Sequence, residues 1–375
     1  MCQTGVVTKK NASRMKAALN KDKIMAAIPK ECFEKSLFWS LYWMVFDYAM
    51  WLGATYLIWQ LHTSGEYEKL PVWQQYGVTL AFWLFSGFFM WCMFVVGHDC
   101  GHTTFSNYEW FNDFMGHVTH GSILVPYWPW RRSHNFHHQF HNHIEKDYSH
   151  PWYTQEMIKG EGFEMARAMD AYPFMRLAFP LLGWPVYLYG MPDGSHWIPF
   201  KAQRLWEKAS TSEALRCYVS SAVVVMYAYA IFELNNRDIW SMAYYYIAPL
   251  SVFGWWLVCV TYLQHHDHGT LVYDDTNWKF VDAAFETVDR QYDPTGLLDK
   301  LMHNITNGHV VHHLFFTKIP HYNLAKATAA IRAYLKDAGA DSVYKFEKTY
   351  DYAWRLHKYM YLFGFSATEA PKKRN

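Results

Sequence analysis

Long stretches without charged residues constrain this chain more than any other feature of its sequence. Residues 71–97 and 239–264 contain no Asp, Glu, Lys or Arg, residues 36–61 contain only Asp47, and residues 214–234 carry one charge near each end. A helix of about 20 apolar residues crosses the hydrocarbon core of a bilayer, and charges near its ends can reach the two surfaces. The sequence therefore predicts four membrane-spanning helices.

The composition favours a membrane protein. Hydrophobic residues make up 51% of the 375 and aromatic residues 19%, more than a soluble core of this length requires. The mean hydropathy of -0.18 points the other way, but hydropathy scales score Trp and Tyr as nearly polar, whereas membrane proteins place these rings at the headgroup level. A net charge of +1 provides no basic field for nucleic acid. The six cysteines include no CxxC pair, which excludes a disulfide framework.

Three histidine clusters follow the apolar stretches, with sequences HDCGH, HNFHH and HVVHH. Residues three or four positions apart share one face of a helix, so the imidazoles of each cluster can point at a common site. Neutral imidazole is a preferred ligand for iron, zinc, copper and nickel. The clusters supply eight candidate ligands: His98, His102, His134, His137, His138, His309, His312 and His313.

The order of spans and clusters predicts a topology. Residues 1–35 are polar, with eight Lys or Arg against three acids and no cleavable signal pattern, so we expect them to stay in the cytosol. Two crossings then return the chain to the cytosolic side at His98, and two more return it at Gln264. All three clusters are therefore predicted on one membrane face. Residues 173–190 are apolar but interrupted by three prolines, and we expect them to lie along the interface.

The three clusters, with spans before and between them, resemble the histidine boxes of membrane-bound fatty acyl desaturases. The resemblance covers the chain from about Ala27 to Tyr361 and is nearest to the methyl-end (omega-6 and omega-3) branch, in which the third box begins with His, as it does at His309. Front-end desaturases usually have Gln there and a fused cytochrome b5 with an HPGG motif, which this chain lacks. The first box has Asp99 where plant relatives usually have Glu.

The resemblance implies an all-α membrane protein, with four transmembrane helices and a cytosolic cap that carries a di-iron site. It implies two iron ions as cofactor and O₂ as co-substrate. It also implies a division into a cytosolic leader (1–35), a desaturase domain (36–365) and a basic tail (366–375). The implied metal ligands are His98, His102, His134, His137, His138, His309, His312 and His313, with His265 beyond the fourth span as the ninth.

The implied activity is the introduction of a cis double bond toward the methyl end of an unsaturated fatty acyl lipid, with Δ12 desaturation of oleate to linoleate as the first expectation. Omega-3 desaturation is the alternative, and hydroxylases and acetylenases share the same boxes. A membrane zinc hydrolase or receptor is a more distant alternative, because zinc sites usually take about four ligands. A non-enzymatic membrane scaffold would leave the clusters unexplained. We expect a narrow apolar tunnel to position the acyl chain.

The expected partners and location also follow from the resemblance. The chain has no haem-attachment motif and no dinucleotide-binding glycine fingerprint, so the implied electron donors are cytochrome b5 and its NADH reductase. The ending Lys372-Lys373-Arg374-Asn375 resembles a dilysine signal for the endoplasmic reticulum membrane, with both termini cytosolic; the alternative is an ordinary basic tail.

The remaining histidines carry weaker expectations. Four of them either orient ligands together with Asp99, Glu145 and Asp147 or are simply packed polar residues; these are His117, His120, His303 and His321. Five are predicted to belong to a wet, polar cytosolic cap, namely His141, His143, His150, His266 and His268. Three are interpreted as ordinary polar or surface residues, namely His62, His196 and His357.

Overall fold

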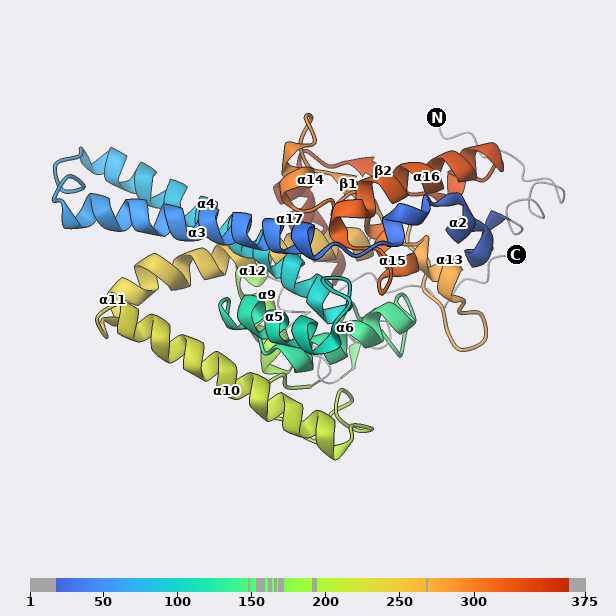
Figure 1. Ribbon diagram of the computed structural model, residues 1–375, viewed down its shortest axis with the longest axis horizontal. Coiled ribbons are helices and arrows are strands. Elements are labelled where there is room, and N and C mark those ends of the chain that lie inside the picture. Colours follow the sequence, from blue (N-terminus) through green and yellow to red (C-terminus); the bar gives the residue numbers. More distant parts are fainter. Residues whose placement is uncertain are drawn as a thin grey trace.

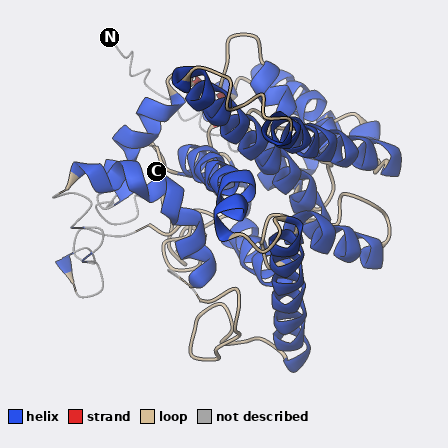
Figure 2. Cartoon of the chain, turned by 90° about the vertical axis from the view of Figure 1, so that its left-hand side faces the viewer, coloured by secondary structure: helices blue, strands red, loops and turns tan. Residues whose placement is uncertain are grey.

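The computed structural model describes residues 18–147, 149–152, 159–160, 164, 167, 172–190, 194–267 and 269–363, and this part of the chain is mostly helical. Two long helical hairpins project from one end of a compact group of shorter helices (Figures 1 and 2). The elements are α2 (Lys21–Ala27), η1 (Lys30–Phe33), α3 (Leu37–Thr63), α4 (Val72–Gly101), α5 (Glu109–Gly121), α6 (Tyr127–Phe140), α9 (Pro173–Tyr189), α10 (Thr211–Leu234), α11 (Ile239–Met242), η2 (Ala243–Ile247), α12 (Ala248–His265), α13 (Phe280–Ala284), β1 (Asp289–Gln291), α14 (Leu297–Leu301), α15 (His309–Phe315), η3 (His321–Asn323), α16 (Leu324–Asp337), η4 (Asp341–Val343), β2 (Phe346–Lys348) and α17 (Tyr352–Phe363).

The first hairpin consists of α3 and α4. The Ser36 hydroxyl accepts the backbone N–H of Trp39 and so caps the start of α3. The chain reverses at Gly65, whose φ of +72° suits glycine. Pro71 is the N-cap residue just before α4, where its missing N–H costs no helical hydrogen bond. Each helix is more than 25 residues long, so at 1.5 Å per residue each extends about 40 Å.

The second hairpin consists of α10 and the continuous run of α11, η2 and α12. It begins with a capping box, in which the Ser210 hydroxyl accepts the backbone N–H of Glu213 while the Glu213 carboxylate accepts the backbone N–H of Ser210. The run through η2 contains a π-helical segment, Ala243–Ile247. Helix α12 packs against α4 and α9, so the two hairpins meet along α4 and α12.

Three helices of the described chain are long and apolar enough to cross a membrane: Val72–Gly101, Thr211–Leu234 and Ile239–His265. These correspond to three of the four spans predicted from the sequence. Helix α3, the fourth, has the required length but lies outside this set. It is rich in Trp and Tyr, which lower mean hydropathy although both residues suit a membrane interface.

The prolines of α9 do not interrupt it. Pro173 occupies its first turn, where no hydrogen bond is lost, and Pro180 and Pro185 lie inside one continuous helix. The helix packs along α12 and buries Trp184 and Leu188 against it. The expectation of an element lying along the interface is not tested by these contacts, but the element is helical and contributes to the core.

Shorter helices gather at the end of the bundle where α4 and α12 terminate (Figure 1). The helix α2 packs on α16 and buries Ile24 there, and the following turn buries Cys32. The only strands in the described chain are β1 and β2, which pair in parallel through Asp289–Phe346, Arg290–Glu347 and Gln291–Lys348. This group of short elements, which we call the cap, contains α5, α6 and α13 to α16.

Candidate metal centre

Five histidines from three separate helices form the first group of candidate ligands. Each offers a ring nitrogen, and these nitrogens all lie within 4.8 Å of one another. Helix α4 supplies the first box at its end, α6 supplies two members of the second box, and α15 supplies one member of the third. The group is His98, His102, His134, His138 and His312.

A second group lies beside the first. His265, at the end of α12, belongs to two sets of histidines whose ring nitrogens lie within 4.8 Å of one another. One set contains His309 and His313 of α15, and the other contains His137 of α6 and His150. His265 therefore connects the two sets. The ring centroids of His138 and His313 are only 4.3 Å apart, so the two groups share a boundary.

The ring nitrogens face one another at a nearly constant distance. The Nε2 atoms of His98 and His102 are 3.1 Å apart, and those of His138 and His312 are 3.0 Å apart. Three further Nε2–Nε2 distances, His134–His138, His265–His309 and His309–His313, are 3.0–3.1 Å. Two nitrogens bound at about 2.1 Å to one ion and at right angles to each other are about 3 Å apart. The spacing therefore fits nitrogen ligands around metal ions.

The electrostatics of the cluster suit metal ligands. Burial, together with neighbouring imidazoles, holds the pKa of His138, His312 and His313 well below the usual 6.5, because a charged ring would lose its hydration. The rings are therefore neutral, which is the form that binds metal. Six buried Nδ1 atoms also lack a hydrogen-bond partner in the described chain; they belong to His98, His102, His138, His265, His309 and His313.

One ligand candidate has an evident orienting partner. Asp147 Oδ1 accepts a hydrogen bond from His137 Nδ1 at 2.8 Å, and both residues are buried. This bond leaves His137 Nε2 for the site, in the arrangement common behind metal-bound histidines. The same carboxylate accepts the backbone N–H groups of Asn142, Ser149 and His150. Asp147 thus also holds the loop that brings His150 to the site.

The third box requires a small residue before it. Gly308 precedes α15, and a Cβ atom at this position would lie 2.9 Å from the Asn304 carbonyl oxygen and 2.9 Å from Leu324 Cβ. This close approach seats the start of α15 against α16. All seven residues of α15 are buried, so the box lies entirely inside the cap.

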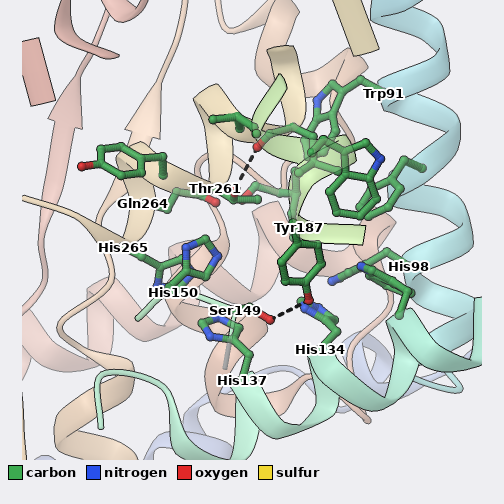
Figure 3. A pocket seen from close by; sticks show the side chains of 18 of the residues that line it. Trp91, His98, His134, His137, Ser149, His150, Tyr187, Thr261, Gln264 and His265 are labelled. Carbon is green, nitrogen blue, oxygen red and sulfur yellow. Dashed lines mark hydrogen bonds between the residues drawn. The ribbon is translucent and has the colours of Figure 1, made fainter. Parts of the chain in front are cut away.

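An apolar cavity of about 210 Å³ adjoins the cluster. Its walls combine apolar side chains, including Trp91, Trp184 and Leu257, with the histidines of both groups (Figure 3). Tyr187 lies on the histidine side of the cavity, where its hydroxyl is within hydrogen-bond distance of Ser133 and Ser149. The cavity has the character of a site for an apolar chain beside a metal centre.

The structure brings all nine sequence-predicted ligands into the two groups. It adds His150, which spacing alone does not reveal, because it lies in a loop thirteen positions beyond His137. The expectation of wet surroundings for His141, His143 and His266 is wrong, since all three are buried. His268 lies outside the described residues, and His150 is half-buried at the cluster.

Comparisons with known proteins identify the class. Residues 71–344 match the family model described as fatty acid desaturase. The chain is 39% identical to the Delta(12) fatty acid desaturase fat-2 of Caenorhabditis elegans, across 90% of this chain and 85% of the relative. It is 38% identical to the omega-3 fatty acid desaturase fat-1 of the same organism, across 91% and 81%. It is 30% identical to a Delta(12)-acyl-lipid-desaturase of Punica granatum, across 88% and 83%.

The helical bundle, the histidine cluster and the family match define an oxidoreductase of lipid metabolism. The chain belongs to the fatty acid desaturase family. Within that family it is similar to the methyl-end enzymes, since Δ12 and omega-3 desaturases both match it over most of their length. This confirms the branch expected from the histidine boxes.

Proposed function

We propose that this chain is a di-iron, O₂-dependent acyl-lipid desaturase that converts oleoyl to linoleoyl chains by Δ12 desaturation. The observation that carries the proposal is the placement of the two histidine groups against an apolar cavity. The greater identity to a Δ12 enzyme supports this regiochemistry only narrowly, at 39% against 38% for an omega-3 enzyme. Omega-3 desaturation is therefore the second candidate.

The proposed ligands are the nine histidines of the sequence analysis together with His150. Iron fits these residues because nitrogen donors in numbers well above four suit two ions better than one zinc ion. Bound iron would supply the oxidant that removes hydrogen from an unactivated methylene. The balanced reaction is R-CH₂-CH₂-R′ + O₂ + 2 electrons + 2 protons → R-CH=CH-R′ + 2 H₂O, so electrons must come from a donor.

The residues of the chain would perform the remaining tasks. Trp91, Trp184 and Leu257 would hold the acyl chain and exclude water from the reacting carbons. Asp147 would keep His137 in the tautomer that presents Nε2 to the site. The cavity walls would thereby determine which methylene groups approach the histidines.

The proposal includes the membrane arrangement. We propose that α3 is the fourth span and that the cap faces the cytosol of the endoplasmic reticulum, with both termini on that side. The loop between α3 and α4 and the turn at α11 lie at the end of the bundle opposite the cap, which supports this arrangement (Figure 1). Cytochrome b5 and its NADH reductase are the proposed electron donors, docking on the cap.

The test is expression in a host that makes oleate but no polyunsaturated lipids, followed by mass spectrometry of double-bond positions. A new double bond at carbon 12 of oleate is the expected result. Product formed only when linoleate is supplied would replace the proposal with omega-3 desaturation. An added hydroxyl group would indicate a hydroxylase on the same scaffold, and stoichiometric zinc with full activity would exclude the di-iron site.

A further inference from the structure

A second polar cluster lies beside the metal centre, inside the first hairpin. Asp47 of α3 is fully buried, and its Oδ2 atom accepts a hydrogen bond from His303 Nε2 at 2.8 Å. Cys92 of α4 lies next to this pair. Asp47 is the only charged residue of segment 36–61, and its partner His303 lies 256 positions further along the chain. An unpaired charge would be costly to bury in an apolar hairpin, so the contact offsets part of that cost.

The backbone holds His303 in this position. His303 and Asn304 have φ values of +59° and +57°, which are uncommon for residues other than glycine. The backbone N–H of Asn304 donates to the Asp299 carbonyl at 2.8 Å, and the ring of Trp43 meets His303 edge-on at 5.1 Å. Two successive left-handed residues therefore direct His303 from the cap into the first hairpin.

A path of contacts connects this pair to the first histidine box. The ring centroid of His303 is 4.6 Å from that of His321. The backbone N–H and the Nδ1 atom of His321 both donate to Asp99 Oδ2 at 2.9 Å. The other oxygen of Asp99 lies 3.8 Å from Nδ1 of His98. All these side chains are buried.

We infer that Asp47 and His303 are positioning residues of the metal centre, which fix the orientation of His98 through His321 and Asp99. The inference rests on the proposed di-iron function. A carboxylate beside a histidine ligand can orient its ring and raise its basicity. Asp99 faces His98 Nδ1 at 3.8 Å, and His321 donates both hydrogen bonds that hold the Asp99 carboxylate from the other side. The pair also ties α3 to the segment before α15, the helix that carries the third box.

Two other roles are possible for the same residues. The pair could be a buried ion pair that stabilises the fold without influence on His98. Alternatively, Asp47, Cys92 and His303 could bind a third metal ion, since their donor atoms lie within 4.8 Å of one another. The distance of 2.8 Å between Asp47 Oδ2 and His303 Nε2 is that of a direct hydrogen bond, and counting the bound metal ions separates this arrangement from an ion site.

The experiment compares Asp47→Leu, His303→Leu, the double variant and Asp47→Asn in the full-length, iron-loaded chain. Each single leucine variant leaves a buried polar partner without a hydrogen bond, so we expect less folded protein in the membrane. The double variant removes both polar groups and should recover part of that yield, although leucine at position 303 must still adopt the left-handed backbone. Iron retention against a chelator should nevertheless stay roughly tenfold or more below wild type, with an altered Mössbauer spectrum. Asp47→Asn keeps an acceptor oxygen and should preserve the spectrum.

Thr79→Val is the matched control. Thr79 is also buried in the first hairpin, where its hydroxyl contacts Tyr67 and Tyr244 at 2.8 Å. It lies toward the start of α4, whereas His98 lies near the end of that helix. Loss of this hydroxyl should change the yield of folded protein but not the Mössbauer spectrum of the bound iron. A double variant that keeps the wild-type Mössbauer spectrum and iron retention would show that Asp47 and His303 are only a structural ion pair. Three metal ions per wild-type chain, with one lost in Asp47→Leu, would also overturn the inference. Absence of iron from the wild-type chain would instead contradict the proposed function itself.

Discussion

At the scale of single residues, the convergence of ring nitrogens makes a direct prediction about metal content. The Nε2 atom of His312 in α15 lies 3.0 Å from the Nε2 atom of His138 in α6, so this pair joins the third box to the second. The change His312→Ala should lower bound iron from the proposed two ions per chain and reduce desaturation by roughly a hundredfold or more. Elemental analysis and lipid analysis of purified membranes measure the two quantities.

His62→Ala is the control for this prediction. His62 lies at the far end of α3, where its ring contacts Tyr244 and Tyr245. The control should keep its iron. Equal iron loss in both variants would show that His312→Ala acts by unfolding the chain rather than by removing a ligand.

The burial of a second residue, His196, should make the stability of the protein depend on pH. Burial lowers the pKa of His196 to about 3, whereas its usual value is 6.5. At low pH the unfolded chain therefore binds a proton at His196 that the folded chain excludes. The contribution of neutral His196 to the free energy of unfolding is complete above about pH 6.5 and is lost as the pH falls. The loss at about pH 5 amounts to about 2 kcal/mol.

The measurement is the thermal midpoint of unfolding in detergent between about pH 8 and pH 5. His196→Gln cannot take up this proton, so its midpoint should fall less over the same range than that of wild type. Parallel curves for the two proteins would mean that other groups cause the acid sensitivity. The ring of His196 packs against Tyr187, so lower stability of the variant at neutral pH is expected.

The sequence predicts the site better than it predicts what surrounds the site. Helical spacing identifies His98, His102 and the members of the other two boxes, because the donors of each box lie on one helix face. It cannot identify His150, which reaches the site through a loop held by Asp147. The Asp47–His303 contact is equally inaccessible, because it depends on tertiary packing between residues far apart in the chain.

At the scale of elements, the contact between α4 and α12 sets the distance between the first box and His265. Gly87 allows this approach, because a Cβ atom there would lie 2.5 Å from the Pro249 carbonyl oxygen and from Val252 Cβ. Periodicity predicts both helices but not this contact. The same limit applies to α9, whose prolines suggested an interrupted element although it forms one helix against α12.

Gly87→Ala should therefore destabilise the protein by roughly 1–3 kcal/mol, since overpacking forces the two helices apart. Iron retention should fall with it, because His98 and His265 lie at the ends of these helices. Gly53→Ala in α3 is the matched control, since no atom lies within 4 Å of its Cβ position. Thermal unfolding and iron content measure both effects. A Gly87→Ala variant with wild-type stability and iron content would contradict the close packing of α4 against α12.

At the scale of the whole molecule, both hairpins end on the same side, and this shared end brings the boxes together. The end of α4 delivers His98 and His102 to the cap and α12 delivers His265, while α6 and α15 supply the members of the other two boxes (Figure 1). An odd number of crossings between boxes would separate them across the bilayer. Helix α3 lies outside the three helices of the described chain that hydropathy identifies as able to cross a membrane, so its crossing is the part of the arrangement to test directly.

Cysteine labelling decides whether α3 crosses the membrane. Five native cysteines, Cys32, Cys92, Cys100, Cys217 and Cys259, are buried, so a Cys2→Ser background suits the assay. In sealed microsomes, a membrane-impermeant maleimide should label Glu34→Cys, before α3, and Lys336→Cys in α16, both at exposed positions of the cap end. Glu68→Cys, in the exposed loop after α3, should react only once the membrane is permeabilised, because 27 helical residues span about 40 Å. Equal labelling of Glu34→Cys and Glu68→Cys in sealed microsomes would mean that α3 does not cross the bilayer.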